Sequence, residues 1–141
     1  MQMPDVNILV YAHREGSPGH ARYADWLKKL ATGPEPFALS EPAMHGFVRV
    51  VTNPRIFDPP SSTKDAFTFL NALIERPGCT VLRPGPGHWA IFQKLCLKSG
   101  VRGKLVSDAA HAALAIEYGC EWVTADTDFG RFVPELRWRH L

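Results

Sequence analysis

The chain has 141 residues, of which 45% are hydrophobic and 21% charged, a length and balance typical of one globular domain and not of a disordered tail or a two-domain enzyme. Sixteen lysines and arginines against fourteen acidic residues leave a net charge of +2, which by itself does not indicate a nucleic-acid partner. Three cysteines without a CxxC pair predict free thiols. No apolar run approaches the ~20 residues of a membrane span and the N-terminal segment does not resemble a signal peptide, so we expect a cytoplasmic protein without membrane association.

The first part of the chain predicts helices that alternate with short strands. Residues 6–12 are an apolar run whose periodicity does not distinguish a buried strand from a short helix beginning after Asp5. Ser17 and Pro18 are typical of a helix cap and first turn, which predicts a helix over residues 18–31. The next expected elements are a strand over 37–40, a helix face over 44–51 and a loop over 53–62.

The same alternation continues to the end of the chain. Ser62 is expected to cap a helix with apolar residues over 66–74, and Gly100 to end a later one. Ser107 or Asp108 is expected to cap an alanine-rich helix that Gly119 ends. The expected strands are 79–82, 122–125 and 136–140. Strands separated by helices imply βαβ units, and therefore a mostly parallel sheet with helices on both faces.

Five acidic residues fall at junctions between the expected elements: Asp5, Glu41, Asp108, Asp126 and Asp128. Each of them alone is explained by the preference of acids for helix caps and turns. As a set they indicate a site at one edge of the expected sheet, because ligands of parallel sheets bind beyond the carboxyl ends of the strands. Carboxylates gathered there repel one another unless a cation neutralises them, and hard oxygen ligands favour Mg²⁺ or Mn²⁺.

Neighbouring polar residues fit a phosphate substrate. Asn7 and Thr124 adjoin the acids and could orient water or a ligand oxygen, although a cap and an ordinary strand residue are the simpler explanations. The basic residues that could hold backbone phosphates, or could simply be solvated charges, are Arg14, Arg49, Arg55, Arg102, Lys104 and Arg131. No GxxxxGK[ST], GxGxxG, HExxH or GxSxG motif is present, which argues against nucleotide-dependent, zinc-protease and α/β-hydrolase chemistry. The six histidines have no ligand spacing.

Four segments, in this order and spacing, resemble the PIN-domain ribonucleases and, among them, the VapC toxins of bacterial toxin–antitoxin pairs: PDVNILVYA, LSEPAMHGFVRVVTNPRIF, GKLVSDAAHAALAIEYGC and WVTADTDFGRF. The resemblance implies a single domain over residues 1–141, a three-layer α/β/α sandwich whose five-stranded parallel sheet has the order 3-2-1-4-5. It also implies a helix directly after Asp5. The chain departs from the family pattern in its first strand, MQMP, which is short and contains a proline, and in the sequence SDAAH, where a polar residue is expected after SDA.

The resemblance further implies a metal-dependent endoribonuclease that cleaves a structured RNA such as transfer or ribosomal RNA and so inhibits translation. The metal would be Mg²⁺ or Mn²⁺, the partners a VapB-like antitoxin and a second copy of the chain. The family pattern assigns the acidic quartet to Asp5, Glu41, Asp108 and Asp126, with Asp128 as a fifth acid and Asn7 and Thr124 as supporting residues. If these five acids form one site, nine acids face sixteen bases elsewhere, a surface charge of about +7 that suits RNA.

Two other functional classes remain open from the residues alone. One is a receiver-like signalling module that binds Mg²⁺ and is phosphorylated on aspartate. It needs an acidic pair after the first strand and an aspartate after the third, whereas Asp5 stands alone and the third strand ends in Leu82, Arg83 and Pro84. The other is a non-catalytic RNA-binding α/β domain whose acids are all caps.

Overall fold

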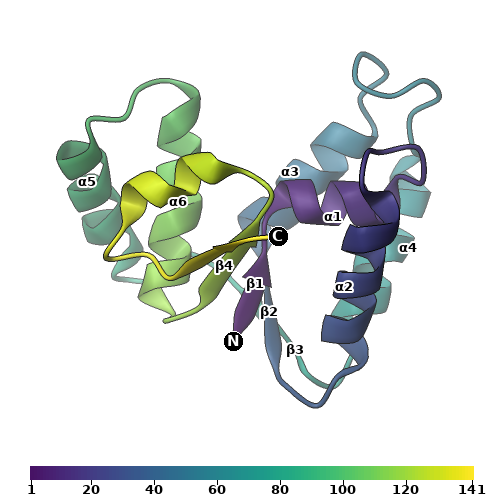
Figure 1. Cartoon of the computed structure of the whole chain (residues 1–141), viewed down its shortest axis with the longest axis horizontal. Coiled ribbons are helices and arrows are strands. Elements are labelled where there is room, and N and C mark those ends of the chain that lie inside the picture. Colours follow the sequence, from purple (N-terminus) through teal and green to yellow (C-terminus); the bar gives the residue numbers. More distant parts are fainter.

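A sheet of five parallel strands, in the order β3-β2-β1-β4-β5, runs through the computed structural model, which describes residues 1–141 (Figure 1). The strands are β1 (Gln2–Pro4), β2 (Phe37–Ser40), β3 (Cys79–Leu82), β4 (Glu121–Thr124) and β5 (Trp138–His140). All four pairings are parallel. The predicted sheet order and fold class are therefore confirmed, and the carboxyl ends of all five strands meet at one edge.

Helices cover both faces of this sheet, with α1 to α4 on one side and α5, α6 and η1 on the other (Figure 1). They are α1 (Val6–His13), α2 (His20–Thr32), α3 (Glu41–Val51), α4 (Thr63–Ile74), α5 (His88–Ser99), α6 (Lys104–Glu117) and the 3₁₀ helix η1 (Thr127–Phe132). Strand side chains alternate between two cores, so that Phe37 and Leu39 pack towards α1 to α4 while Ala38 packs towards α6. None of the helices has the length and apolar character that a membrane crossing requires.

The central strand β1 is only three residues long and ends at Pro4. Proline has no N–H for the sheet ladder, and the Asp5 N–H makes the next bond instead, to the Val123 carbonyl at 2.8 Å. Asp5 then caps α1, since its carboxylate accepts from the Val6 N–H. Residues 6–12 therefore belong to a helix, and of the two readings that the apolar run allows the strand is wrong.

Two helices begin at residues other than those predicted. The helix predicted from Pro18 begins at His20, because Gly19 adopts a left-handed conformation with φ of +74° that interrupts the helix. The alanine-rich helix begins at Lys104, directly after Gly103 with φ of +58°, so neither Ser107 nor Asp108 is its cap. The cap explanation for Asp108 is wrong, and its carboxylate projects from the second turn of α6.

The last strand is also shorter than the predicted 136–140. Leu136 directs its N–H to the Phe132 carbonyl at 3.0 Å, which closes the end of η1 instead of extending the sheet. Pairing with β4 begins at Trp138, opposite Trp122. Leu136 is buried among the residues of the α5–α6 side, so its apolar side chain is explained by the core and not by a strand.

The loop between β3 and α5 is fixed to the end of α6 by side chains. The Glu117 carboxylate accepts from the N–H groups of Gly85 and Gly87, both at 2.9 Å. The neighbouring Tyr118 hydroxyl donates to the Arg83 carbonyl at 2.8 Å. These bonds determine where the loop and the start of α5 lie relative to α6.

We expect Glu117→Ala to lower the free energy of unfolding by about 1–3 kcal/mol, the usual effect of losing hydrogen bonds to a charged group. Amide hydrogen exchange at Gly85 and Gly87 should accelerate, since both N–H groups lose their acceptor. Denaturant unfolding and exchange measured by mass spectrometry check this, with exposed Glu75→Ala as the control. Unchanged exchange in the loop would show that Glu117 does not hold it.

Candidate functional site

The hydroxyl of Thr124 joins the ends of the two central strands. It donates to Asp5 Oδ2 at 2.6 Å and lies in β4, whereas Asp5 follows β1. Thr124 is fully buried and Asp5 is only 6% exposed. The other oxygen of Asp5, Oδ1, accepts from the Val6 N–H at 2.6 Å. The Asp5 carboxylate is therefore held on both oxygens at the carboxyl edge of the sheet.

Asn7 connects this pair to the turn after β4. Its Nδ2 donates to Thr124 Oγ1 at 3.2 Å, and its Oδ1 accepts from the Ala125 N–H at 3.2 Å. The Asp126 N–H also donates to Thr124 Oγ1, at 3.0 Å. Asn7 and Thr124 therefore position the acids through hydrogen bonds, and the structure brings both of them together with Asp5.

Three further aspartates lie around this network. Asp126 caps η1, with its Oδ1 accepting from the Asp128 N–H at 2.8 Å. Asp108 projects from α6, and its Oδ2 is buried without any hydrogen-bond partner. Asp128 is half-exposed and accepts from Arg131 Nη2 at 3.1 Å. Of the five predicted acids, the structure brings Asp108 and Asp126 near Asp5, and Asp128 near Asp108.

The aspartates perturb one another. Burial raises the pKa of Asp5 from 3.8 to about 6 against the lowering effect of its hydrogen bonds to Thr124 and Val6, and the charges of Asp108 and Asp126 raise it further. The pKa of Asp108 is raised by burial first and then by the Asp126 charge, while Lys104 lowers it. The negative charges are therefore close enough to repel, in a setting that disfavours ionisation.

The donor set fits a hard divalent cation. Oxygen is the ligand type that Mg²⁺ and Mn²⁺ prefer, and Asp108 Oδ2 is a buried oxygen for which the chain provides no partner. No three acidic, histidine or cysteine side chains stand close enough together here to hold one ion. Coordination by several aspartates therefore requires rotations of their side chains towards a shared centre.

Glu41 forms an ion pair with Arg83 Nε, and its side chain is 29% exposed. Glu41 directly follows β2 as predicted, but it is not among the charges that raise the pKa of Asp5 or Asp108. Sequence reasoning missed Arg83. No sequence pattern pointed to it, because the contact depends on the register in which Ser40 pairs with Leu82, which makes Glu41 and Arg83 the next residues on the two strands.

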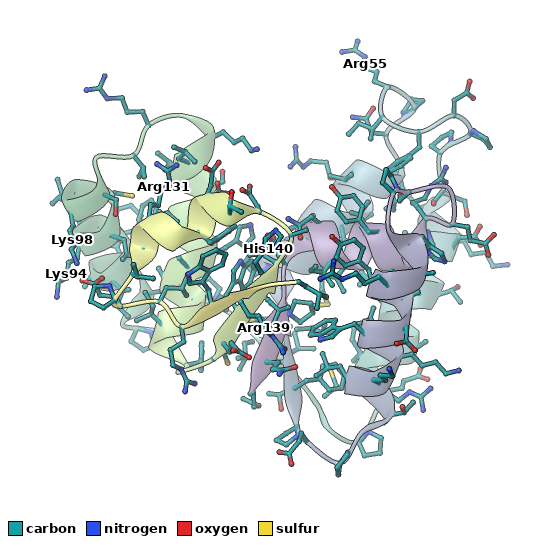
Figure 2. All side chains as sticks on the ribbon, in the orientation of Figure 1. Arg55, Lys94, Lys98, Arg131, Arg139 and His140 are labelled. Carbon is teal, nitrogen blue, oxygen red and sulfur yellow. The ribbon has the colours of Figure 1, made fainter.

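The predicted basic residues divide into near and distant ones. Lys104 and Arg131 lower the pKa of Asp108, so both lie near the acids, and Arg131 stands on η1 (Figure 2). Arg14 holds the loop before α4 through Ser61 and the Pro59 carbonyl. The structure therefore does not bring Arg14 to the acidic site. Arg102 is exposed in the loop before α6 and Arg49 is exposed on α3.

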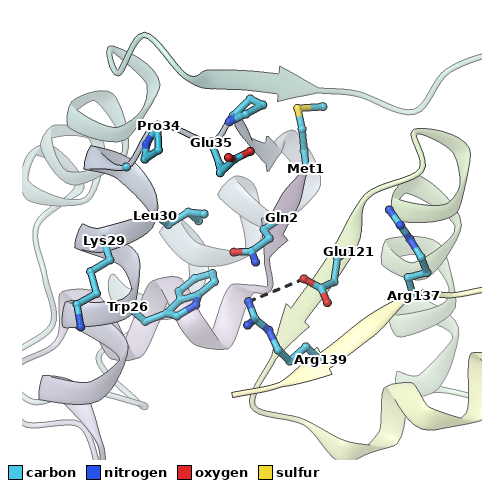
Figure 3. A pocket seen from close by; sticks show the side chains of 12 residues that line it. Met1, Gln2, Trp26, Lys29, Leu30, Pro34, Glu35, Glu121, Arg137 and Arg139 are labelled. Carbon is cyan, nitrogen blue, oxygen red and sulfur yellow. Dashed lines mark ion pairs between the residues drawn. The ribbon is translucent and has the colours of Figure 1, made fainter.

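One cavity lies at the opposite edge of the sheet. It has a volume of about 590 Å³ and is lined by the amino-terminal ends of strands and by α2, including Gln2, Trp26 and Glu121 (Figure 3). Its charges are mixed, with Arg139 facing Glu121 at 3.8 Å. This cavity contains none of the predicted site residues, so it is separate from the predicted functional site.

Comparison with known proteins gives a consistent result. The family model described as "PIN domain" matches residues 3–133. The chain is 44% identical over 136 residues to "VapC ribonuclease Mb2897" of Mycobacterium bovis, covering 96% of this chain and 92% of that protein. It is 38% identical to "Ribonuclease VapC25" of Mycobacterium tuberculosis, covering 94% of this chain and 93% of the relative.

Solved structures share the fold at low sequence identity. VapBC2 from Rickettsia felis, bound to a DNA fragment from its promoter, has a TM-score of 0.71 at 19% identity and covers 99% of this chain and 97% of that chain. VapC20 of Mycobacterium tuberculosis, described as a sarcin-ricin loop cleaving toxin, has a TM-score of 0.68 at 14% identity. The match covers 97% of this chain and 99% of that chain.

The raised pKa of Asp5 predicts a pH dependence of stability without metal. The folded state binds the proton more tightly than the unfolded state, so this contribution is present below pH 3.8 and is lost as pH rises through about 6. Asp5→Asn lacks that titration. The stability of the variant minus that of the wild type should therefore increase by about 2 kcal/mol between pH 4 and pH 7.

Chemical denaturation in EDTA at several pH values measures this difference. Only the difference is informative, because burial lowers the pKa of His111 to about 4 and gives the opposite trend in both proteins. A difference that is flat across this range would show that Asp5 ionises as freely in the folded protein as in the unfolded one.

The mutual repulsion predicts that Asp126→Asn raises the melting temperature of the metal-free protein by a few degrees, the equivalent of about 1 kcal/mol. The amide oxygen of asparagine can still accept from the Asp128 N–H, so only the charge is lost. Asp25→Asn is the control, since exposed Asp25 pairs with Lys29 and its charge is not repelled. A lower melting temperature for Asp126→Asn in EDTA would contradict a repulsive cluster.

Proposed function

The chain belongs to the PIN-domain family, as a toxin of its VapC ribonucleases, and on this premise we propose that it is a metal-dependent endoribonuclease that hydrolyses phosphodiester bonds in RNA. The observation that carries the proposal is the convergence of Asp5, Asp108 and Asp126 at the carboxyl edge, where one buried carboxylate oxygen of Asp108 has no partner. Buried like charges are costly, and a cation bound there offsets that cost.

We assign the metal ligands to Asp5, Asp108 and Asp126, with Asp128 and Glu41 contributing directly or through water. A bound Mg²⁺ or Mn²⁺ supplies activation of water and neutralisation of charge on the phosphate, so the reaction requires no side-chain nucleophile. Glu41 would have to leave Arg83 to take part, and Arg83 is then free to meet a phosphate.

The other residues of the site orient the acidic side chains or attract the RNA backbone. Thr124 and Asn7 fix the Asp5 carboxylate on one face of the site through the bonds described above. Lys104 and Arg131 place positive charge beside Asp108, where they favour the approach of an RNA backbone. We include exposed Arg49 and Arg102 in the same role. Arg14 is excluded, because its guanidinium is bound to the loop before α4 and not brought to the acidic site.

The proposed substrate is a structured RNA of the translation machinery, transfer RNA or ribosomal RNA, whose cleavage would inhibit translation. The structural relative VapC20 is described as cleaving the sarcin-ricin loop, and the sequence relatives carry the name ribonuclease. The receiver-like alternative is not favoured, because β3 is followed by Arg83 and Pro84 and not by the aspartate such a module needs.

The proposed partner is a small VapB-like antitoxin. Similar folds occur in VapBC2 of Rickettsia felis and in VapBC-1 of Haemophilus influenzae, both solved as toxin–antitoxin pairs. An antitoxin segment that covers the carboxyl edge would block RNA and metal together. We also propose that the chain forms a homodimer, which sedimentation of the purified protein measures.

Incubation of labelled transfer and ribosomal RNA with the purified chain tests the activity. We expect cleavage in Mg²⁺ or Mn²⁺ and none in EDTA. Asp108→Asn should reduce the rate at least about 100-fold, which is the upper end for a residue that only supports a metal ligand. Asp25→Asn, which removes an exposed carboxylate at α2, is the matched control and should cleave at the wild-type rate.

Cleavage that persists in EDTA would contradict metal dependence, and an active Asp108→Asn protein would contradict the assignment of Asp108. A protein that binds RNA and cleaves none in either metal would favour the non-catalytic RNA-binding alternative.

A further inference from the structure

A second cavity, of about 390 Å³, lies beside the aspartates on the β2–β3 side of the carboxyl edge. Val6 and Ser107 line it, and these residues directly follow Asp5 and directly precede Asp108 in the chain. Its other walls come from α3, from Pro84 after β3, and from the start of α5 at His88. Ligand pockets commonly have volumes of roughly 300–1,000 Å³, so the cavity is large enough for one small ligand.

Two histidines in its wall have nitrogen atoms that the chain leaves unpaired. The Nδ1 atoms of His88 and His111 are both buried and have no hydrogen-bond partner. Each ring stacks on an aromatic ring. The ring centroids of His88 and Phe92 are 6.3 Å apart with an interplanar angle of 3°, and those of His111 and Trp122 are 5.4 Å apart with an angle of 21°. A buried polar atom without a partner is unfavourable, and both histidines line the cavity.

The side chains that line the cavity carry no negative charge, unlike the neighbouring aspartates. No aspartate or glutamate lines it, whereas His45 and Arg49 lie one turn apart on α3. Arg49 is exposed and takes part in no ion pair, so its guanidinium is free to bind a phosphate. Burial and the nearby charge of His88 lower the pKa of His111 to about 4, so His111 is neutral and suits the edge of a base.

The helix α3 passes close to the start of α1 at this point, because Gly46 has no side chain. A Cβ atom at Gly46 would lie 3.0 Å from Val6 Cγ2, and both residues line the cavity. Glycine within a helix is unfavourable relative to alanine. Here it keeps the floor of the cavity open and leaves Val6, next to Asp5, undisturbed.

We propose that this cavity binds one nucleotide of the RNA strand next to the phosphodiester that is cleaved, with Arg49 on its phosphate and with His88, His111 and Ser107 at its base. The assignment rests on the proposed ribonuclease function. Single-stranded RNA is commonly recognised through bases that lie against histidine or other flat side chains and bond along their edges. Pro84 supplies an apolar surface in the same cavity. The cavity would then contribute to the choice of nucleotide.

Binding of nucleoside 5′-monophosphates to the full chain in EDTA tests the cavity without cleavage. NMR signals of the histidine rings should shift for His45, His88 and His111, while those of His13, His20 and His140 stay constant. Calorimetry should show Arg49→Gln and His88→Ala each weakening binding about ten-fold, as expected for the loss of one charge-assisted or buried hydrogen bond. Arg76→Gln is the matched control, because exposed Arg76 precedes β3 and so lies at the opposite edge of the sheet.

Inorganic phosphate is the second probe and should bind more weakly than at least one nucleotide. Equal binding of phosphate and of all nucleotides would overturn the role of the histidines at the base. Unshifted signals from His88 and His111, or unchanged affinity in both variants, would overturn the site itself. The wild-type signals test the proposal even where a variant folds poorly.

Cleavage assays with metal separate this proposal from the ribonuclease function. If the chain cleaves RNA and both variants show a raised KM with a changed nucleotide preference, the subsite is supported. Cleavage with the wild-type KM and preference in both variants would overturn the subsite and leave the ribonuclease function standing. Nucleotide binding without cleavage of any RNA would overturn the proposed function and leave a nucleotide site.

Discussion

The bond from the Thr124 hydroxyl to the Asp5 carboxylate is the interaction on which the carboxyl edge depends. A threonine hydroxyl has one donor and two acceptor positions, and all three are used: the donor goes to Asp5, and the acceptors receive the Asn7 amide and the Asp126 N–H. One buried side chain therefore connects the end of β1 to β4 and also fixes the backbone at Asp126, in the turn after β4. Without the hydroxyl, one buried carboxylate oxygen and two partly buried N–H groups would lose their partner together.

Packing elsewhere in the molecule brings the third carboxylate to this edge. The inner face of α6 consists of small residues, with Ala109, Ala112 and Ala113 fully buried, so the helix axis lies close to the sheet. Asp108 precedes this face and is carried to within reach of the Asp126 charge. The apolar burial of α6 thus helps to offset the electrostatic cost of placing an acid in a partly desolvated site, where Asp108 Oδ2 has no hydrogen-bond partner and the charge of Lys104 is favourable.

The sequence was sufficient to predict the features that depend on the order of the elements and on the alternation of strands and helices. Parallel strands bring Asp5, Asp126 and the start of α3 to one edge whatever the side chains do, so the location of the site followed from the topology. The exact starts of α2 and α6 did not follow, because cap preferences pointed to Ser17 and Ser107 whereas left-handed glycines ended the preceding turns elsewhere. The pairing of Glu41 with Arg83 depends on the β2–β3 register, which one sequence does not specify. The histidines of the second cavity have no spacing pattern, and only the fold places His88 near His111.

The carboxyl edge is divided between two electrostatic environments, and the division follows the strand order. On the β1–β4 side burial and neighbouring carboxylates raise the pKa of Asp5 and of Asp108, so a polyanion is repelled there until cations are bound. On the β2–β3 side Arg83 already neutralises Glu41 and the adjoining cavity has no acid, so the same polyanion is attracted there without cations. Attraction by fixed basic side chains weakens with added salt, whereas the buried acids are screened much less. Binding of an RNA strand and neutralisation of the acidic centre therefore respond to different ions, monovalent salt for the first and a divalent cation for the second. The fold separates these two dependences, because the four aspartates lie around the ends of β1 and β4, whereas Arg49 and the cavity without acids lie on the β2–β3 side.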